Sequence, residues 1–169
     1  MKKLNILKAI VDFVWFVSIP IIIIITLFIP AIFFYNFNDL NITINSINFK
    51  QIENNITLKL LLALTALNYL LIISALFYFR KVLTIFLSVK IFDNKVIYLF
   101  NKIGYLLTIS GIASLILSIV SKLYFEQKVT LEFGLNQHLV LICLGLFFMV
   151  LSEIFKIAKI AKQENDLTI

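Results

Sequence analysis

Long uncharged stretches divide the chain into four apolar blocks, and the charged residues gather between them. The blocks cover residues 13–35, 60–79, 103–121 and 133–152, and each is 19 to 23 residues long. At a rise of about 1.5 Å per residue, an α-helix of this length crosses the ~30 Å hydrocarbon core of a bilayer. The pattern therefore predicts an all-α membrane protein with four transmembrane helices.

The segment at residues 80–92 is apolar, but it is too short to cross a membrane. Lys81 and Lys90 leave only eight uncharged residues between them, which is about 12 Å of helix. A helical wheel gathers the polar side chains in one sector, opposite the apolar ones; they are those of Arg80, Lys81, Thr84 and Ser88. We therefore expect an amphipathic helix that lies in the membrane interface or continues the second span out along it. Asp93 then suits the N-cap of the helix that becomes the third span.

Basic residues are divided unevenly between the two sides of the membrane that these spans define. Of the 15 Lys and Arg residues, 11 lie near the termini and in the connection between the second and third spans, and 4 lie in the other two connections. Segments rich in Lys and Arg stay on the cytoplasmic side. We therefore expect both termini to be cytoplasmic.

These boundaries define a single four-span membrane domain over residues 1–169. The predicted spans are about 10–35, 58–79, 102–123 and 136–156. The predicted outer loops are 36–57 and 124–135, and the predicted cytoplasmic parts are the loop 80–101 and the tail 157–169. Pro20 lies inside the first span and is expected to kink it, because proline removes a helical hydrogen bond.

Two segments of the outer loops alternate between apolar and polar residues. They are LNITIN at residues 40–45 and VTLEFGL at residues 129–135. Alternation with a period of two is typical of a half-buried β-strand. Residues 40–44 and 129–135 are expected either to pair as a small extracytoplasmic sheet over the outer ends of the helices or to remain unpaired loops.

The composition agrees with a membrane protein and excludes several other classes. Hydrophobic residues make up 62% of the 169 residues and charged residues 14%, and a soluble domain of this size could not bury so much apolar surface. The net charge is +6, but the basic residues flank the apolar blocks and form no single patch, so direct binding of nucleic acid is not expected. The single cysteine, Cys143, excludes an intrachain disulfide and a multi-cysteine metal site.

Ionisable groups, which catalysis within a membrane requires, are almost absent from the spans. Asp12 lies close to the cytoplasmic surface, where it is expected to be solvated or paired with Lys8 one turn earlier. His138 is the only histidine, and a lone histidine cannot form a three-ligand zinc site. The chain also lacks the signature motifs of metalloproteases, serine hydrolases and nucleotide-binding loops. We therefore expect no enzymatic activity, no cofactor and no metal.

Small and polar residues within the spans indicate helix packing. Ser110, Ser114 and Ser118 recur every four residues in the third span, and Gly111 adjoins them. Small residues at this spacing let two helices approach closely, and their hydroxyls can bond across the interface. Asn68, in the middle of the second span, is the expected buried polar partner. These five residues are the candidate helix-packing residues; a conduction path would need a more polar lining.

The C-terminal sequence LGLFFMVLSEIFKIAKIAKQENDLTI resembles the end of a family of small four-span bacterial membrane proteins, the domain of unknown function 2975 family. Its members finish with a span, an acidic residue and an aromatic–basic pair, which Glu153, Phe155 and Lys156 match here. They close on a Glu-x-Asp-Leu-Thr tail with a final aliphatic residue, which QENDLTI matches. In the cytoplasmic loop Phe92 also fits the family, whereas Val96 stands where the family usually has Asn.

The resemblance implies a protein of the bacterial inner (cytoplasmic) membrane with no established activity. Genes of the family often neighbour small helix-turn-helix regulators, which implies a membrane component that sequesters or informs such a transcription factor. We therefore expect a non-enzymatic sensor or regulatory partner that acts through its cytoplasmic face. The candidate interaction residues lie at the end of the fourth span and in the tail, and they are Glu153, Lys156, Lys159, Lys162, Gln163, Glu164, Asp166 and Leu167.

Two other interpretations stay open on the sequence. One is a small transporter or channel, which the near absence of intramembrane charge disfavours. The other is a structural or immunity-type membrane protein with no signalling role. The expected partners are the lipid bilayer and a cytosolic helix-turn-helix regulator, and the sequence specifies no oligomeric state.

Overall fold

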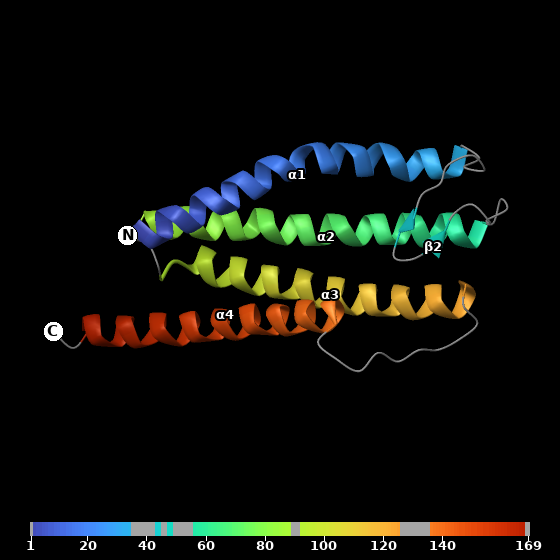
Figure 1. Ribbon diagram of the computed structural model, residues 1–169. Helices are drawn as coiled ribbons and strands as arrows, with labels where there is room; N and C mark the ends of the chain where they lie inside the picture. The colour runs from blue at the N-terminus through green and yellow to red at the C-terminus, as the bar shows by residue number, and fades with distance from the viewer. Residues whose placement is uncertain are drawn as a thin grey trace.

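The computed structural model describes residues 2–34, 43–44, 47–48, 56–88, 92–125 and 136–167. Within these residues the chain forms four long helices, which are α1 (Lys2–Phe34), α2 (Ile56–Leu87), α3 (Asn94–Phe125) and α4 (Gln137–Leu167) (Figure 1). Each contains a stretch of 29 to 31 residues that is long and apolar enough to cross a membrane. The protein therefore has the build of an all-α multi-pass membrane protein, as the four apolar blocks predict.

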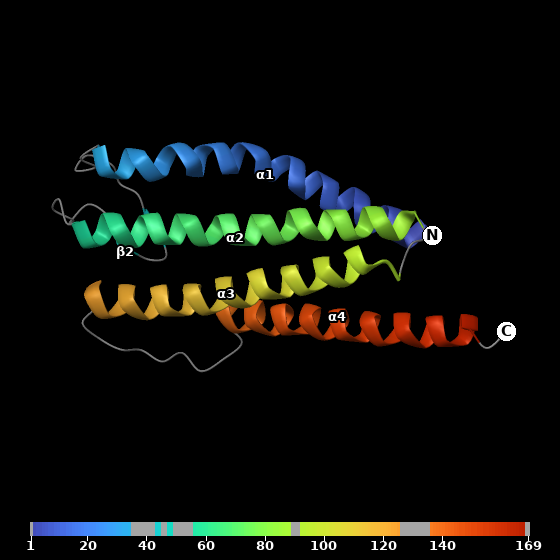
Figure 2. The same cartoon turned by 180° about the vertical axis from the view of Figure 1, so that it is seen from behind.

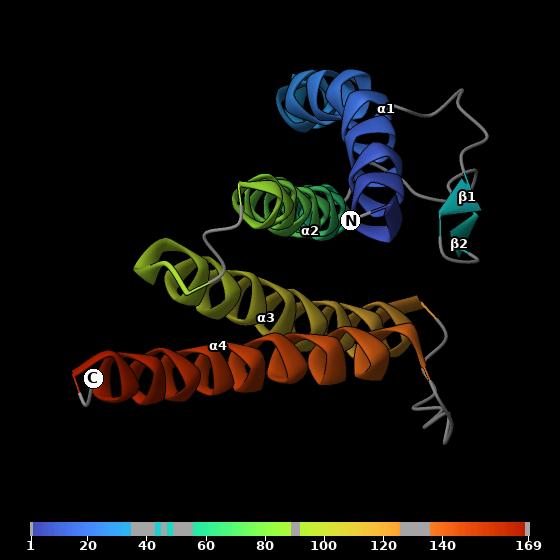
Figure 3. The same ribbon diagram turned by 90° about the vertical axis from the view of Figure 1, so that its left-hand side faces the viewer.

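The helices alternate in direction and lie in chain order, one beside the next (Figures 1 and 3). The packing of α3 against α4 is the most extensive, followed by that of α2 against α3 and of α1 against α2. The view from behind shows that α1 begins, α2 ends, α3 begins and α4 ends on the same side (Figure 2). We call this side the terminal end of the bundle and the other side the opposite end.

The start of α3 is set by Asp93, which caps the helix as its sequence predicts. The Asp93 carboxylate accepts a hydrogen bond from the backbone N–H of Lys95 at 3.0 Å. The backbone carbonyl of Asp93 accepts one from the N–H of Val96 at 3.0 Å. A capping side chain satisfies an N–H group that the first turn leaves unpaired. Because α3 begins so early, most of the predicted cytoplasmic loop 80–101 is helical.

The helix α2 continues without a break to Leu87, so residues 80–87 continue the second span, which is one of the two expected forms; a separate interfacial helix over residues 80–92 is not supported. Val82 has no exposed surface and belongs to a core cluster that includes residues of α3. Phe86 stacks on Phe155 of α4, with ring centroids 5.8 Å apart. The apolar side of this segment therefore packs against α3 and α4, whereas an interfacial helix would bury it in lipid.

The main core lies near the terminal end, where α2, α3 and α4 meet. Phe100 of α3 contacts Phe148 and Phe155 of α4, with ring centroids 5.8 Å and 5.3 Å apart. Lipid is as apolar as these side chains, so the contact is stabilised by close packing and not by removal from water. The buried members of the cluster are Ala75, Val82, Val96, Leu99, Phe100, Ile103 and Leu107.

The described part of the connection between α1 and α2 contains a minimal antiparallel pair. β1 (Thr43–Ile44) pairs with β2 (Ile47–Asn48), and Thr43 lies opposite Asn48. The predicted pairing of residues 40–44 with residues 129–135 is not supported, because β1 takes its partner from the same connection and residues 129–135 lie outside the described residues. Local pairing closes a short loop, which costs less entropy than pairing across the sequence.

The first helix, α1, bends along its length (Figure 1). Pro20 lies inside it, and a proline both removes a main-chain hydrogen bond and crowds the preceding turn. The Ser18 hydroxyl donates to the Val14 carbonyl at 2.7 Å, a contact that also favours bending. Phe13 and Phe16 remain 69% and 72% exposed, which suits a helix side that faces lipid.

Candidate functional site

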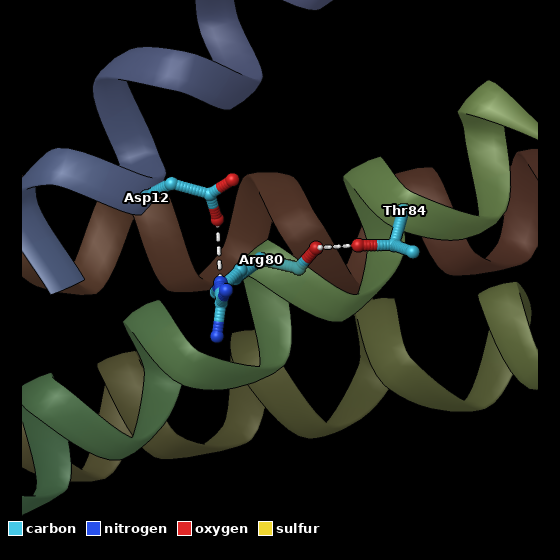
Figure 4. Close-up of polar contacts among 3 residues, drawn as sticks. All are labelled: Asp12, Arg80 and Thr84. Atoms are coloured by element: carbon cyan, nitrogen blue, oxygen red, sulfur yellow. Dashed lines mark hydrogen bonds and ion pairs between the residues drawn. The ribbon is translucent and has the colours of Figure 1, made fainter. Parts of the chain in front are cut away.

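Asp12 of α1 forms an ion pair with Arg80 of α2 at the terminal end (Figure 4). Arg80 Nε donates to Asp12 Oδ1 at 2.5 Å, and the two side chains are 40% and 34% exposed. One turn further on, Thr84 Oγ1 donates to the Arg80 carbonyl at 3.0 Å. Asp12 is partly exposed, as expected, but its partner is Arg80 and not Lys8, because α2 brings a guanidinium from 68 residues away in the sequence.

Basic and aromatic side chains are interleaved along α2 and α3 close to this ion pair. Lys81 Nζ lies 4.2 Å from the centroid of the Phe77 ring. Lys102 Nζ lies 4.4 Å from the centroid of the Tyr78 ring and 5.7 Å from that of Tyr98. An aromatic face attracts a cation at these distances. The contacts therefore hold both ammonium groups against the helix surfaces.

A groove of about 390 Å³ lies between α2 and α3 beside these cations. The surface of the groove is mainly apolar, and it is formed largely by the hydrocarbon parts of the side chains that line it. No group of three or more His, Cys, Asp or Glu in the described part of the chain is placed to hold a metal ion. The groove is lined by Lys81, Thr84, Ile85, Lys95, Tyr98 and Leu99.

The lysines among the candidate interaction residues lie on the last turns of α4, which projects past the other helices at the terminal end (Figure 1). Lys159 Nζ donates to Asn94 Oδ1 at 2.6 Å. Lys162 Nζ lies 5.7 Å from the centroid of the Phe92 ring. The Lys156 side chain is exposed. Two of the three lysines therefore contact the segment that enters α3, and the third faces outward.

The other candidate interaction residues fall into two groups. The side chains of Glu153, Gln163 and Glu164 are exposed. Asp166 and Leu167 belong to α4, but their side chains lie outside the described residues. The structure thus extends α4 through most of the predicted tail 157–169, and it presents polar groups along that extension.

The closest approach of α3 and α4 occurs at glycines. A Cβ atom on Gly104 would lie 2.6 Å from the Gly145 carbonyl oxygen, and one on Gly111 would lie 3.0 Å from the His138 carbonyl oxygen. Ser110, next to Gly111, has no exposed surface. Sequence reasoning named Ser110 and Gly111 but missed Gly104 and Gly145 as packing residues. Gly104 and Gly111 are seven residues apart, which is two turns along one face of the helix. This spacing is the sequence signal that identifies Gly104.

Ser152 is a further contact residue that sequence reasoning missed. It is 6% exposed, and its hydroxyl donates to the Ile97 carbonyl of α3 at 2.8 Å. Hydrogen bonds of this kind between membrane helices contribute about 0.6 kcal/mol on average. No small residue lies three or four positions from Ser152 in the fourth span, so no spacing pattern marks it.

The remaining candidate packing residues line a cavity beside the α3–α4 contact. Ser114 Oγ lies 2.7 Å from His138 Nδ1. Asn68, which is 9% exposed, and Ser118 line the same cavity, toward the opposite end of the bundle. The predicted packing set is therefore divided between two places in the fold.

No curated protein and no solved structure matches the chain. A family model described as "Protein of unknown function (DUF2975)" matches residues 16–169. This match covers nearly the whole chain, including all of α2, α3 and α4 and more than half of α1. The chain therefore belongs to the DUF2975 family.

Proposed function

We propose that this protein is a non-enzymatic membrane sensor or regulatory partner that acts through its terminal end on a small helix-turn-helix transcription regulator. The observation that carries the proposal is the projection of α4. Lys159 contacts Asn94 at the start of α3, and eight further residues continue the helix beyond that contact. Eight residues extend a helix by about 12 Å. A helix that leaves the bundle in this way offers a surface to a partner protein.

We infer that the terminal end faces the cytoplasm of a bacterium, with the protein in the inner membrane. Eleven of the 15 basic residues lie near the termini and in the connection between the second and third spans. Segments on the cytoplasmic side carry most of the Lys and Arg in membrane proteins. The anionic lipid of that leaflet attracts each such residue by about 1 kcal/mol. The connections at the opposite end then face outward, where a stimulus arrives.

The exposed lysines of the terminal end support an acidic docking element on the partner. Lys81 is exposed on α2, Lys95 on α3 and Lys156 on α4. Complementary charge raises the association rate and sets the orientation of two proteins. Association through such a surface weakens as the salt concentration rises.

The length of α4 supports a sensor over a transporter, a channel or an immunity-type protein. The helix begins beside Gly111, near the middle of α3, and ends beyond the start of α3. A packed helix shifts as a rigid element, so a displacement of its first turn reaches the projecting end. A transporter or a channel needs a polar path through the membrane, and it has no need of a projecting cytoplasmic helix.

The test is site-directed photo-crosslinking in cells that express the full chain together with a small helix-turn-helix regulator chosen from the genes beside its own. A photoreactive residue in place of Gln163 should crosslink to the regulator. The matched control replaces Ile24 of α1, which is 64% exposed within an apolar stretch and should crosslink to lipid alone. The variants Lys81→Glu and Lys95→Glu should lower the Gln163 yield. Equal yields from both sites, or no regulator crosslink from Gln163, would contradict the proposal.

A further inference from the structure

A second cavity, of about 80 Å³, lies between α2, α3 and the first turn of α4. Thr65 and Asn68 line it from α2, Ser114 and Ser121 from α3, and His138 from α4. No Asp, Glu, Lys or Arg is among the described residues that line it. All three helices contain apolar stretches long enough to cross a membrane. The cavity is therefore a polar space within the membrane part of the protein.

The Asn68 carboxamide oxygen is the group in this cavity that lacks a partner. Asn68 is 9% exposed, and its Oδ1 is buried without a hydrogen bond in the described part of the chain. A buried acceptor without a donor costs free energy, and such atoms in proteins nearly always have a partner in the protein or in ordered water. The oxygen therefore points to a hydrogen-bond donor that the chain itself does not supply.

Three of the hydroxyl groups that line the cavity, those of Thr65, Ser114 and Ser121, do not supply this donor, because each donates to its own helix. Thr65 donates to the Leu62 carbonyl at 2.8 Å, and Ser121 donates to the Ser118 carbonyl at 3.0 Å. Ser114 donates in the same way to a carbonyl one turn earlier, at 2.9 Å. A hydroxyl has one proton to donate and two lone pairs. These three groups therefore offer acceptor oxygens to the cavity.

The position of α4 decides which kind of donor fits. The cavity lies at the first turn of this helix, where Gln137 and His138 line it. The aligned peptide dipoles give a helix N-terminus a partial positive charge of about half an elementary charge. This charge repels a cation, while the acceptor oxygens repel an anion. The site therefore favours an uncharged donor.

We propose that this cavity binds a small uncharged molecule that donates a hydrogen bond to Asn68 Oδ1, namely a primary amide or an alcohol of about four non-hydrogen atoms. The size follows from the volume. About 80 Å³ is a little over half of the ~150 Å³ of an engineered cavity that binds benzene, a molecule of six non-hydrogen atoms. The proposal stands independently of any partner at the terminal end.

The experiment compares two probes of equal size in the full-length protein, reconstituted in lipid nanodiscs. Acetamide and acetone have the same number of non-hydrogen atoms, but only acetamide has N–H donors. A ligand this small binds no tighter than about tens of micromolar, so both are titrated through the millimolar range. The readout is the ¹⁵N side-chain signal of Asn68, assigned by its loss in Asn68→Leu.

Acetamide should shift the Asn68 signal saturably, and acetone should bind at least about tenfold more weakly. Equal effects of the two probes would overturn the proposal. So would the absence of any saturable effect, which would leave water as the sole occupant. A saturable shift on replacing choline chloride by sodium chloride would assign the cavity to a cation instead and would also overturn it.

A second measurement uses stability, because a ligand that binds only the folded protein raises the unfolding temperature. Acetamide should raise it for the wild type relative to acetone, and this difference should vanish in Asn68→Leu. Ser110→Ala is the matched control, since Ser110 Oγ is also buried without a partner but Ser110 does not line the cavity. It should keep the difference. Loss of the difference in both variants, or in neither, would contradict the assignment to Asn68.

Discussion

Replacing Gly104 by alanine is expected to destabilise the packing of α3 on α4 by about 2 kcal/mol. The added Cβ would lie 2.6 Å from the Gly145 carbonyl oxygen and 2.9 Å from the Met149 nitrogen. Both are backbone atoms, so no side-chain rotation relieves the overlap. Ordinary van der Waals contact begins at 3.4 Å, and the two helices must therefore separate locally by about 0.8 Å. Such a gap removes a large part of the dispersion attraction between the facing atoms.

Gly111→Ala is the graded comparison, and it should cost about 1 kcal/mol or less. Here the closest atom is Ile142 Cγ1 at 2.6 Å, which can rotate away, and the nearest backbone atoms are 3.0 Å distant. In an Ile142→Ala background the cost of Gly111→Ala should therefore fall. Met149→Ala should not rescue Gly104→Ala, because the carbonyl oxygen stays in place.

The assay is unfolding by increasing mole fraction of SDS in mixed micelles, followed by far-ultraviolet circular dichroism. Glycine-to-alanine changes also raise intrinsic helix propensity by about 1 kcal/mol in water. This contribution is similar at both positions, so the difference between the two variants isolates the α3–α4 contact. A Gly104→Ala protein as stable as the wild type, or a Gly111→Ala protein that loses equal stability, would refute the reasoning.

Three further outcomes are expected. In a double-mutant cycle of Asp12→Ala and Arg80→Ala, the coupling free energy between the two side chains should be below about 1 kcal/mol. Both side chains are more than a third exposed, so solvent screens the pair. A coupling free energy above about twice that value would show that the pair is desolvated. Phe155→Ala should lower the free energy of unfolding by about 3 kcal/mol in the same SDS titration. Phe147→Ala, at a position 55% exposed, should lower it by under about 1 kcal/mol. Equal losses would contradict the packing of Phe155 against the core. A cysteine at Ser88, in a chain without its native cysteine, should react with a membrane-permeant maleimide but not with an impermeant one in intact cells, and labelling by the impermeant reagent would place the terminal end outside.

The helices and one of their boundaries follow from residues that are close together in the sequence. In lipid every backbone polar group must be paired within the chain, so an uncharged run of about 20 residues forms a helix whatever surrounds it. The start of α3 is equally local, because Asp93 accepts a hydrogen bond from an N–H group two residues ahead. The C-terminal motif works in the same way, since its match to the family depends on residue order alone.

The order of polar and apolar residues did not predict what surrounds residues 80–87. An amphipathic helix has one apolar side, but the sequence does not say whether lipid or another helix covers that side. Val82 is fully buried because α3 returns along α2, and Phe86 stacks on Phe155 because α4 joins them. Both contacts depend on the path of the chain after residue 92.

The partners of the polar side chains also depend on the path of the chain, so the sequence alone did not identify them. Sequence proximity offers Lys8 to Asp12, yet the antiparallel packing of α1 and α2 brings Arg80 to it. Small-residue spacing identifies a contact face on α3, but not the depth at which the partner helix begins.

The point along α3 at which α4 begins decides which small and polar residues pack against α4 and which line the cavity. Because α4 starts beside Gly111, Gly104 and Gly111 pack closely against it, while Asn68 and Ser114 line a cavity at its first turn. The physical reason is that hydrogen bonds between near neighbours set each helix. The offset between helices, in contrast, is set by the summed packing of side chains that are far apart in the sequence.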